Sequence, residues 1–121
     1  MKFIGEIALV VFLISIVGCE PEIGDSCSND TDCGTSENII CDTTQPGGYC
    51  IQLGCHPDSC PEEADCVAVI EGEEREFYCL KGCNRDADCR REYICFIPKD
   101  DTSPIQIIDY EPNYIGVCIP K

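Results

Sequence analysis

The chain has 121 residues, 13 cysteines and a formal net charge of -15, with 23 acidic against 8 basic side chains. The surplus of carboxylates argues against a nucleic-acid partner, whose phosphates need Lys and Arg, and against adsorption on anionic lipid. A cysteine content above roughly 8–10% in an exported chain is typical of a disulfide scaffold. We therefore expect a small disulfide-rich fold of short β-hairpins and loops.

Residues 1–18 have the layout of an export signal. Lys2 precedes an apolar run over residues 7–17, and the small residue Gly18 stands directly before Cys19. We expect this segment to form a signal-peptide helix, because the run is shorter than the roughly 20 apolar residues of a spanning helix. The alternatives are an ordinary signal peptide cut nearby and an uncleaved anchor.

The last residues of this segment, Ile16-Val17-Gly18-Cys19, resemble the lipobox of bacterial lipoproteins. The resemblance implies that Cys19 carries a diacylglyceryl thioether and becomes the acylated N-terminus after cleavage. Residues 19–26 would then be a lipidated tether in the bacterial cell envelope, and Glu20 in place of Asp favours the outer membrane. With Cys19 acylated, the remaining cysteines are even in number and can all pair.

The remaining cysteines form a threefold repeat. We expect three four-cysteine modules in an elongated array, over residues 27–54, 55–82 and 83–121. Their cysteines are Cys27, Cys33, Cys41 and Cys50 in the first, Cys55, Cys60, Cys66 and Cys79 in the second, and Cys83, Cys89, Cys95 and Cys118 in the third. A unit of this size cannot fold on apolar burial alone, since below about 40 residues cross-links are usually required.

Four cysteines allow three pairings in each module. We favour first-to-third and second-to-fourth, because this arrangement ties the leading loop to both strands of a following hairpin. Each disulfide that closes a loop of about 15 residues could contribute roughly 3 kcal/mol. The expected pairs are Cys27–Cys41, Cys33–Cys50, Cys55–Cys66, Cys60–Cys79, Cys83–Cys95 and Cys89–Cys118.

Each module also contains an expected β-hairpin, in which β-branched and aromatic residues flank a turn. The hairpins are expected over residues 38–52, 66–79 and 105–118. Little of the sequence is typical of helix; residues 64–70 and 90–94 could each hold one turn.

The first module contains the string Cys27-x-x-Asp30-x-Asp32-Cys33, which continues to Gly48-Tyr49-Cys50. This string resembles the N-terminal cysteine-rich segment of Dickkopf proteins, and it is similar to strings in cysteine-rich lipoproteins of myxobacteria. The resemblance is strongest over residues 24–55 and 83–95. It implies a disulfide-rich extracytoplasmic module.

Catalytic chemistry has little support in the sequence. The single histidine, His56, lies between Cys55 and Pro57, where a loop residue is expected. The chain has no G-x-S-x-G motif for a serine nucleophile and no C-x-x-C motif for redox exchange. We expect no enzyme and no cofactor, and a structural or protein-interaction role. The alternatives are a protease inhibitor that presents the loop Gln45–Tyr49 and a calcium-dependent adhesion protein.

Calcium is the best metal candidate, because Ca²⁺ takes six to eight oxygen ligands and export favours disulfides over zinc thiolates. The candidate carboxylates are Asp30 with Asp32, Asp86 with Asp88, and Glu62 with Asp65. None matches an EF-hand loop. The favoured alternative is that the aspartates form turns through hydrogen bonds from side chain to backbone.

Residues 104–114 are the most distinctive expected surface. Ile107, Tyr110 and Tyr114 are candidates for a recognition loop, since Tyr is enriched among the residues that dominate protein interfaces. The alternative is that these side chains pack on the neighbouring module. The expected partners are the membrane, reached through Cys19, and an unidentified protein.

Overall fold

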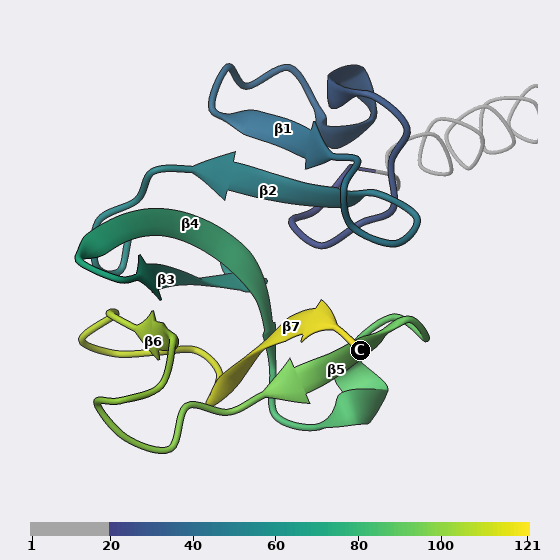
Figure 1. Cartoon of the computed structure of the whole chain (residues 1–121). Coiled ribbons are helices and arrows are strands. Elements are labelled where there is room, and N and C mark those ends of the chain that lie inside the picture. Colours follow the sequence, from purple (N-terminus) through teal and green to yellow (C-terminus); the bar gives the residue numbers. More distant parts are fainter. Residues whose placement is uncertain (1–19) are drawn as a thin grey trace, which may run out of the picture.

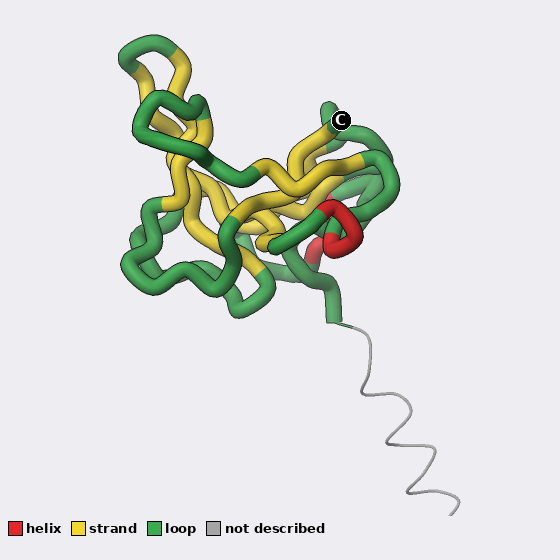
Figure 2. The backbone as a smooth tube through the Cα atoms, turned by 90° about the horizontal axis from the view of Figure 1, so that it is seen from below, coloured by secondary structure: helices red, strands yellow, loops and turns green. Residues whose placement is uncertain are grey.

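The structure is a computed structural model that describes residues 20–121; the expected signal-peptide helix and Cys19 lie outside the described residues. Over residues 20–121 the chain forms strands and two short 3₁₀ helices (Figures 1 and 2). Their bounds are η1 (Asp30–Cys33), β1 (Ile39–Asp42), β2 (Tyr49–Leu53), β3 (Ala64–Glu71), β4 (Glu74–Cys83), η2 (Asp86–Asp88), β5 (Tyr93–Phe96), β6 (Ile105–Ile107) and β7 (Gly116–Pro120). The expected small, disulfide-rich fold of strands and loops is confirmed. No helix of the described part is long and apolar enough to cross a membrane.

Strand β4 connects the three modules. The main sheet has the order β1-β2-β4-β3-β6, and β7 pairs with both β4 and β5. Figure 1 shows β4 as the curved strand that runs from the hairpin with β3 to the start of β7, beside the end of β5. Its partners therefore come from all three modules: β2 from the first, β3 from the second and β7 from the third.

The cysteines occupy the same register in every module. The third and fourth cysteines face each other across a strand pair, as Cys41 and Cys50, Cys66 and Cys79, and Cys95 and Cys118. The disulfides run from first to third and from second to fourth cysteine: Cys27–Cys41, Cys33–Cys50, Cys55–Cys66, Cys60–Cys79, Cys83–Cys95 and Cys89–Cys118. This is the pairing that compactness favours, because it fastens each leading loop to both strands.

The prediction of a third hairpin over residues 105–118 is wrong. The two strands of the third module are β5 and β7, and β6 lies between them in the chain but pairs with β3 of the second module. The reason is the repeat itself, since the first strand of each hairpin holds the third cysteine, which is Cys95 here. The expected helical turn at 64–70 is wrong too, because strand β3 occupies these residues. At 90–94 the chain makes one hydrogen-bonded turn, from Arg90 to Tyr93, and β5 begins at Tyr93.

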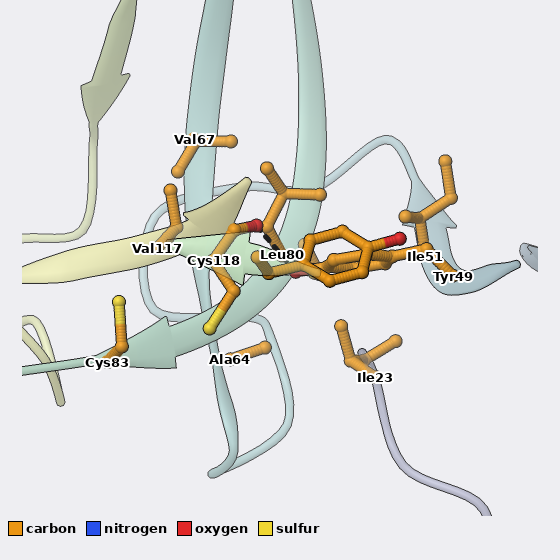
Figure 3. Packing of buried hydrophobic residues seen from close by; sticks show 11 residues of the cluster. Ile23, Tyr49, Ile51, Ala64, Val67, Leu80, Cys83, Val117 and Cys118 are labelled. Carbon is orange, nitrogen blue, oxygen red and sulfur yellow. Dashed lines mark hydrogen bonds between the residues drawn. The ribbon is translucent and has the colours of Figure 1, made fainter. Parts of the chain in front are cut away.

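The modules share one buried cluster, which includes Ile23, Tyr49, Ile51, Val67, Leu80, Tyr93 and Val117 (Figure 3). Within this cluster, Tyr49 makes hydrogen bonds that join the three modules. The Tyr49 hydroxyl donates to the carbonyl of Cys118 at 3.0 Å and accepts from the backbone N–H of Lys81 at 2.9 Å. One side chain of the first module thus bonds to the second and the third, so the array has a common core.

The expected tether over residues 19–26 is shorter than the sequence indicates. Ile23 is buried in the common core, and its N–H donates to the carboxylate of Glu63 at 3.1 Å. The N–H of Gly24 donates to the carbonyl of Cys50 at 2.8 Å. Burial of the apolar Ile23 side chain therefore makes the chain part of the fold well before Cys27.

Candidate functional site

One face of the sheet carries an apolar hollow of about 490 Å³, which we call the sheet groove. Its lining includes Ile40, Ile51, Val69, Tyr78, Ile105 and Ile119, which lie on β1, β2, β3, β4, β6 and β7. Successive side chains of a strand point to opposite faces, so these six residues are the members of their strands that face the same side. All three modules contribute to the groove.

The hydroxyl of Tyr78, which lines this groove, has several negatively charged side chains in its environment. The hydroxyl donates a hydrogen bond to the carboxylate of Glu76. This bond, burial and the negative charges of Glu76, Glu71 and Asp42 raise the pKa of Tyr78 to about 12. Three carboxylates from three strands therefore act on one point at the edge of an apolar surface. Such a site favours a ligand that combines apolar groups with a positive charge.

A second, larger cavity of about 810 Å³ lies on the other side of Leu53 and Tyr78, which line both hollows. It contains His56, the single histidine. The hydroxyl of Ser59 donates to the carbonyl of His56 at 2.7 Å and accepts from its N–H at 2.9 Å. These contacts engage the serine with the backbone, so His56 and Ser59 form a turn.

Two of the carboxylate pairs considered for calcium, Asp30 with Asp32 and Asp86 with Asp88, lie in the leading loops of the first and third modules. Asp32 and Asp88 each accept two backbone N–H groups of their own loop, at 2.8 to 3.3 Å. Asp30 and Asp86 each accept the N–H of the third cysteine of their module, at 2.9 Å. The two pairs thus stabilise turns through hydrogen bonds between side chain and backbone. In addition, the hydrogen bond from the N–H of Asn84 lowers the pKa of Asp88.

The second module obtains its equivalent contact from elsewhere in the chain. Its leading loop is one residue shorter than those of the other modules. The N–H of the third cysteine, Cys66, donates at 3.1 Å to Asp109, which lies between β6 and β7. The other oxygen of Asp109 accepts from the N–H of Asp58 at 2.8 Å. The shorter loop is the one sequence signal that could have indicated this role for Asp109.

Asp65 is a buried carboxyl that faces the same segment. Its two oxygens accept the backbone N–H groups of Asn113 at 3.0 Å and Tyr114 at 3.1 Å. Burial, together with a hydrogen bond and like charge from Asp109, raises the pKa of Asp65 to about 6. A cavity of about 200 Å³ lies beside Asp109 and Asp58. This carboxyl pair fastens the connection between β6 and β7 to the second module.

The structure does not gather the three candidate residues of the recognition loop on one surface. Ile107 is half-buried in β6, where it pairs with Val67 of β3. Tyr114 packs so closely on Gly82 that a Cβ there would lie 2.0 Å from the ring. Only Tyr110, at 83% exposure, projects into solvent.

The loop Gln45–Tyr49, expected to stand free in an inhibitor, is held by the third module. The guanidinium of Arg90 donates to the carbonyls of Pro46 and Gly48, both at 2.7 Å. The hydroxyl of Tyr93 donates to Pro46 as well, at 2.7 Å. Two carbonyls of this loop are therefore already engaged inside the protein.

Among the described residues, every cluster of three side chains with metal-ligand geometry consists of cysteines that are joined in disulfides. Comparisons with protein-family models, curated proteins and solved structures find no match to this chain. The two hollows beside Leu53 and Tyr78 are therefore the surfaces from which a function can be argued.

Proposed function

We propose that this protein is a non-catalytic, lipid-anchored binding module of the bacterial cell envelope. The observation that carries the proposal is the sheet groove, an apolar surface to which all three modules contribute and beside which three carboxylates act on Tyr78. Small-molecule and peptide sites are typically concave and apolar, with a few polar groups that fix orientation. The cysteine repeats, which resemble the Dickkopf N-terminal segment, would serve as the rigid frame of this surface.

The anchor is the lipid that the lipobox resemblance implies on Cys19. Since the fold begins at Ile23, only the residues 20–22 separate the two, a reach of roughly 10 Å at about 3.3 Å per residue. Each buried CH₂ of an acyl chain contributes about 0.8 kcal/mol to attachment. The acidic protein itself has little affinity for anionic lipid. We therefore propose a body held close to the membrane, in the outer membrane, by its acyl chains alone.

Intact mass spectrometry tests the anchor. The protein purified from a bacterial membrane is measured before and after reduction with alkylation, beside a Cys19→Ala variant. We expect a chain that starts at acylated Cys19 and takes up alkyl groups only after reduction. A chain that starts elsewhere, or a thiol labelled without reduction, would contradict the proposal.

Site-specific photocrosslinking tests the groove. A photoreactive phenylalanine replaces Ile119 in the sheet groove and, in a matched control, Ile115, which is 58% exposed and does not line the groove. We expect a discrete adduct from position 119 that excess unlabelled protein suppresses, and none from position 115. Identical adducts at both positions, or none, would count against a binding role for the groove.

A further inference from the structure

One side of strand β4 is unpaired near its start. Strand β3 pairs with β4 from Glu74 to Lys81. On the other side, β2 pairs only with Tyr78 and Cys79, Gly54 bonds to Phe77, and β7 pairs only with the last two residues. The residues 74–76 therefore have no chain on that side, and an unpaired strand edge is a template for another chain.

The backbone groups that point to this free side can be identified. The carbonyl of Phe77 accepts the N–H of Gly54 at 2.8 Å, so Phe77 faces away from β3. Because the direction alternates along an antiparallel strand, the N–H and the carbonyl of Arg75 face the same way, as does the N–H of Phe77. Gly54 already lies opposite Phe77, so the N–H and the carbonyl of Arg75 are the groups without a partner chain.

The larger cavity provides room beside this edge. Its volume is about 810 Å³, and Arg75 and Phe77 line it on the side of β4, opposite Gln52 and His56. Phe77 is 38% exposed, although it is a large apolar side chain. The free edge and an exposed aromatic ring thus lie in the same hollow.

We propose that the free edge of β4 over Glu74–Glu76 binds an extended segment of a basic partner protein by β-strand addition. The side chains on the two faces of this edge determine which segment fits. Glu74 and Glu76 lie on one face, and Arg75 and Phe77 lie on the other, as alternation requires. Opposite charges across a strand pair are favourable, so the segment alternates Lys or Arg, opposite the glutamates, with apolar residues on the face of Phe77. The segment runs antiparallel to β4, and therefore has the same chain direction as β2.

A second copy of this chain fits the edge less well. The hairpin tip carries Glu71, Glu73, Glu74 and Glu76 against the single cation of Arg75, and the whole chain has a net charge of -15. Pairing two such tips would place like charges opposite each other, which destabilises a sheet. The same charges favour a basic partner. The inference rests on the proposed binding role but places the contact on the strand edge, outside the sheet groove.

Capped peptides of the sequence Lys-Val-Lys-Val-Lys-Val test this inference on the intact, oxidised protein. In an antiparallel pair, residues opposite each other share their bonding direction, so the valine opposite Arg75 directs its N–H and its carbonyl to β4. N-methylation of the valines should weaken binding about fivefold or more, since each lost bond costs about 1 kcal/mol. N-methylation of the lysines, which keeps composition and charge, should leave the affinity within about threefold.

Amide hydrogen exchange locates the peptide. We expect the unmethylated peptide to slow exchange at Arg75 about tenfold or more, and the double variant Glu74→Gln/Glu76→Gln to weaken binding several-fold. Glu73→Gln, at the turn of the same hairpin, removes one charge without facing the peptide and is the control.

Four results would overturn strand addition. The first is equal affinity of the two methylated peptides, and the second is no binding at millimolar peptide. The third is self-association of the protein through this edge in sedimentation experiments. Peptide shifts confined to the sheet groove would also overturn it, yet they would leave the proposed binding role in place.

Discussion

Raising the pH from about 4 to about 7 should destabilise this protein through one buried carboxyl group. Asp65 has no exposed surface, and burial followed by the contact with Asp109 raises its pKa from 3.8 to about 6. A carboxyl whose pKa is higher in the folded than in the unfolded chain binds a proton on folding. Below the pKa of Asp65 in the unfolded chain, the titration of this group does not change the free energy of unfolding. As the pH rises from there toward about 6, the free energy of unfolding falls, and above about 6 it falls no further.

The size of the loss follows from the shift and from its surroundings. A shift of about two pKa units corresponds to about 3 kcal/mol, at about 1.4 kcal/mol per unit. The groups that face Asp65 are the carboxyl of Asp109 and the N–H groups of Asn113 and Tyr114, while Asp58 and Glu111 line the adjoining cavity. Because this cavity adjoins the carboxylates, solvent screening weakens their interaction with each other. We therefore expect a loss of about 1–2 kcal/mol between the two pH values.

Denaturant unfolding of the oxidised protein, followed by circular dichroism at a series of pH values, measures this loss. Asp65→Asn removes the titration, so its unfolding free energy should lack the decline, even though the variant is less stable overall because it loses one charged acceptor. Glu73→Gln, which removes a charge at an exposed turn, should retain the decline. An equal decline in Asp65→Asn, or a carbon-13 titration of the Asp65 carboxyl with a midpoint near the ordinary value, would refute the reasoning.

Three further substitutions test how the modules are joined, each by denaturant unfolding. Tyr49→Phe leaves a carbonyl and an N–H unpaired in the core and should cost about 1–3 kcal/mol; a change below about 0.5 kcal/mol would contradict the link. Gly82→Ala puts a Cβ 2.0 Å from the ring of Tyr114 and should cost at least about 1–3 kcal/mol, and adding Tyr114→Ala should restore much of that. Arg90→Lys keeps the charge but loses the guanidinium fork and should cost about 1–3 kcal/mol; unchanged exchange of the 45–48 amides would argue against it.

The cysteine spacing predicts more of this fold than the apolar pattern does. A disulfide joins two cysteines that are distant in the sequence, so a repeated cysteine spacing indicates which strands lie next to each other. The apolar pattern of a strand shows which face is buried but does not show which strand it pairs with. Residues 105–107 do form a strand, but it pairs with β3, which precedes it by more than thirty residues in the chain. The sequence around Ile105 satisfies β-propensity with either partner, so it could not decide between them.

The burial of Asp65 could not be predicted for a related reason. A polar residue at the start of an apolar strand is ordinarily exposed, and this one is covered only because residues 109–114 fold over it. The acidic character of the sheet groove has the same origin, since Asp42, Glu71 and Glu76 act on Tyr78 from three separate strands. Local sequence contains the residues of such a site but not their convergence.

The contacts of the third cysteines bear on whether a single module could act alone. In the first and third modules, an aspartate of the module's own loop accepts a hydrogen bond from the backbone N–H of the third cysteine. In the second, Asp109 of the third module does so. The second module is therefore incomplete without the connection between β6 and β7, and β6 itself supplies Ile105 to the sheet groove. Because the groove further needs Ile40 from the first module, a binding function of this surface belongs to the whole array and not to any one repeat.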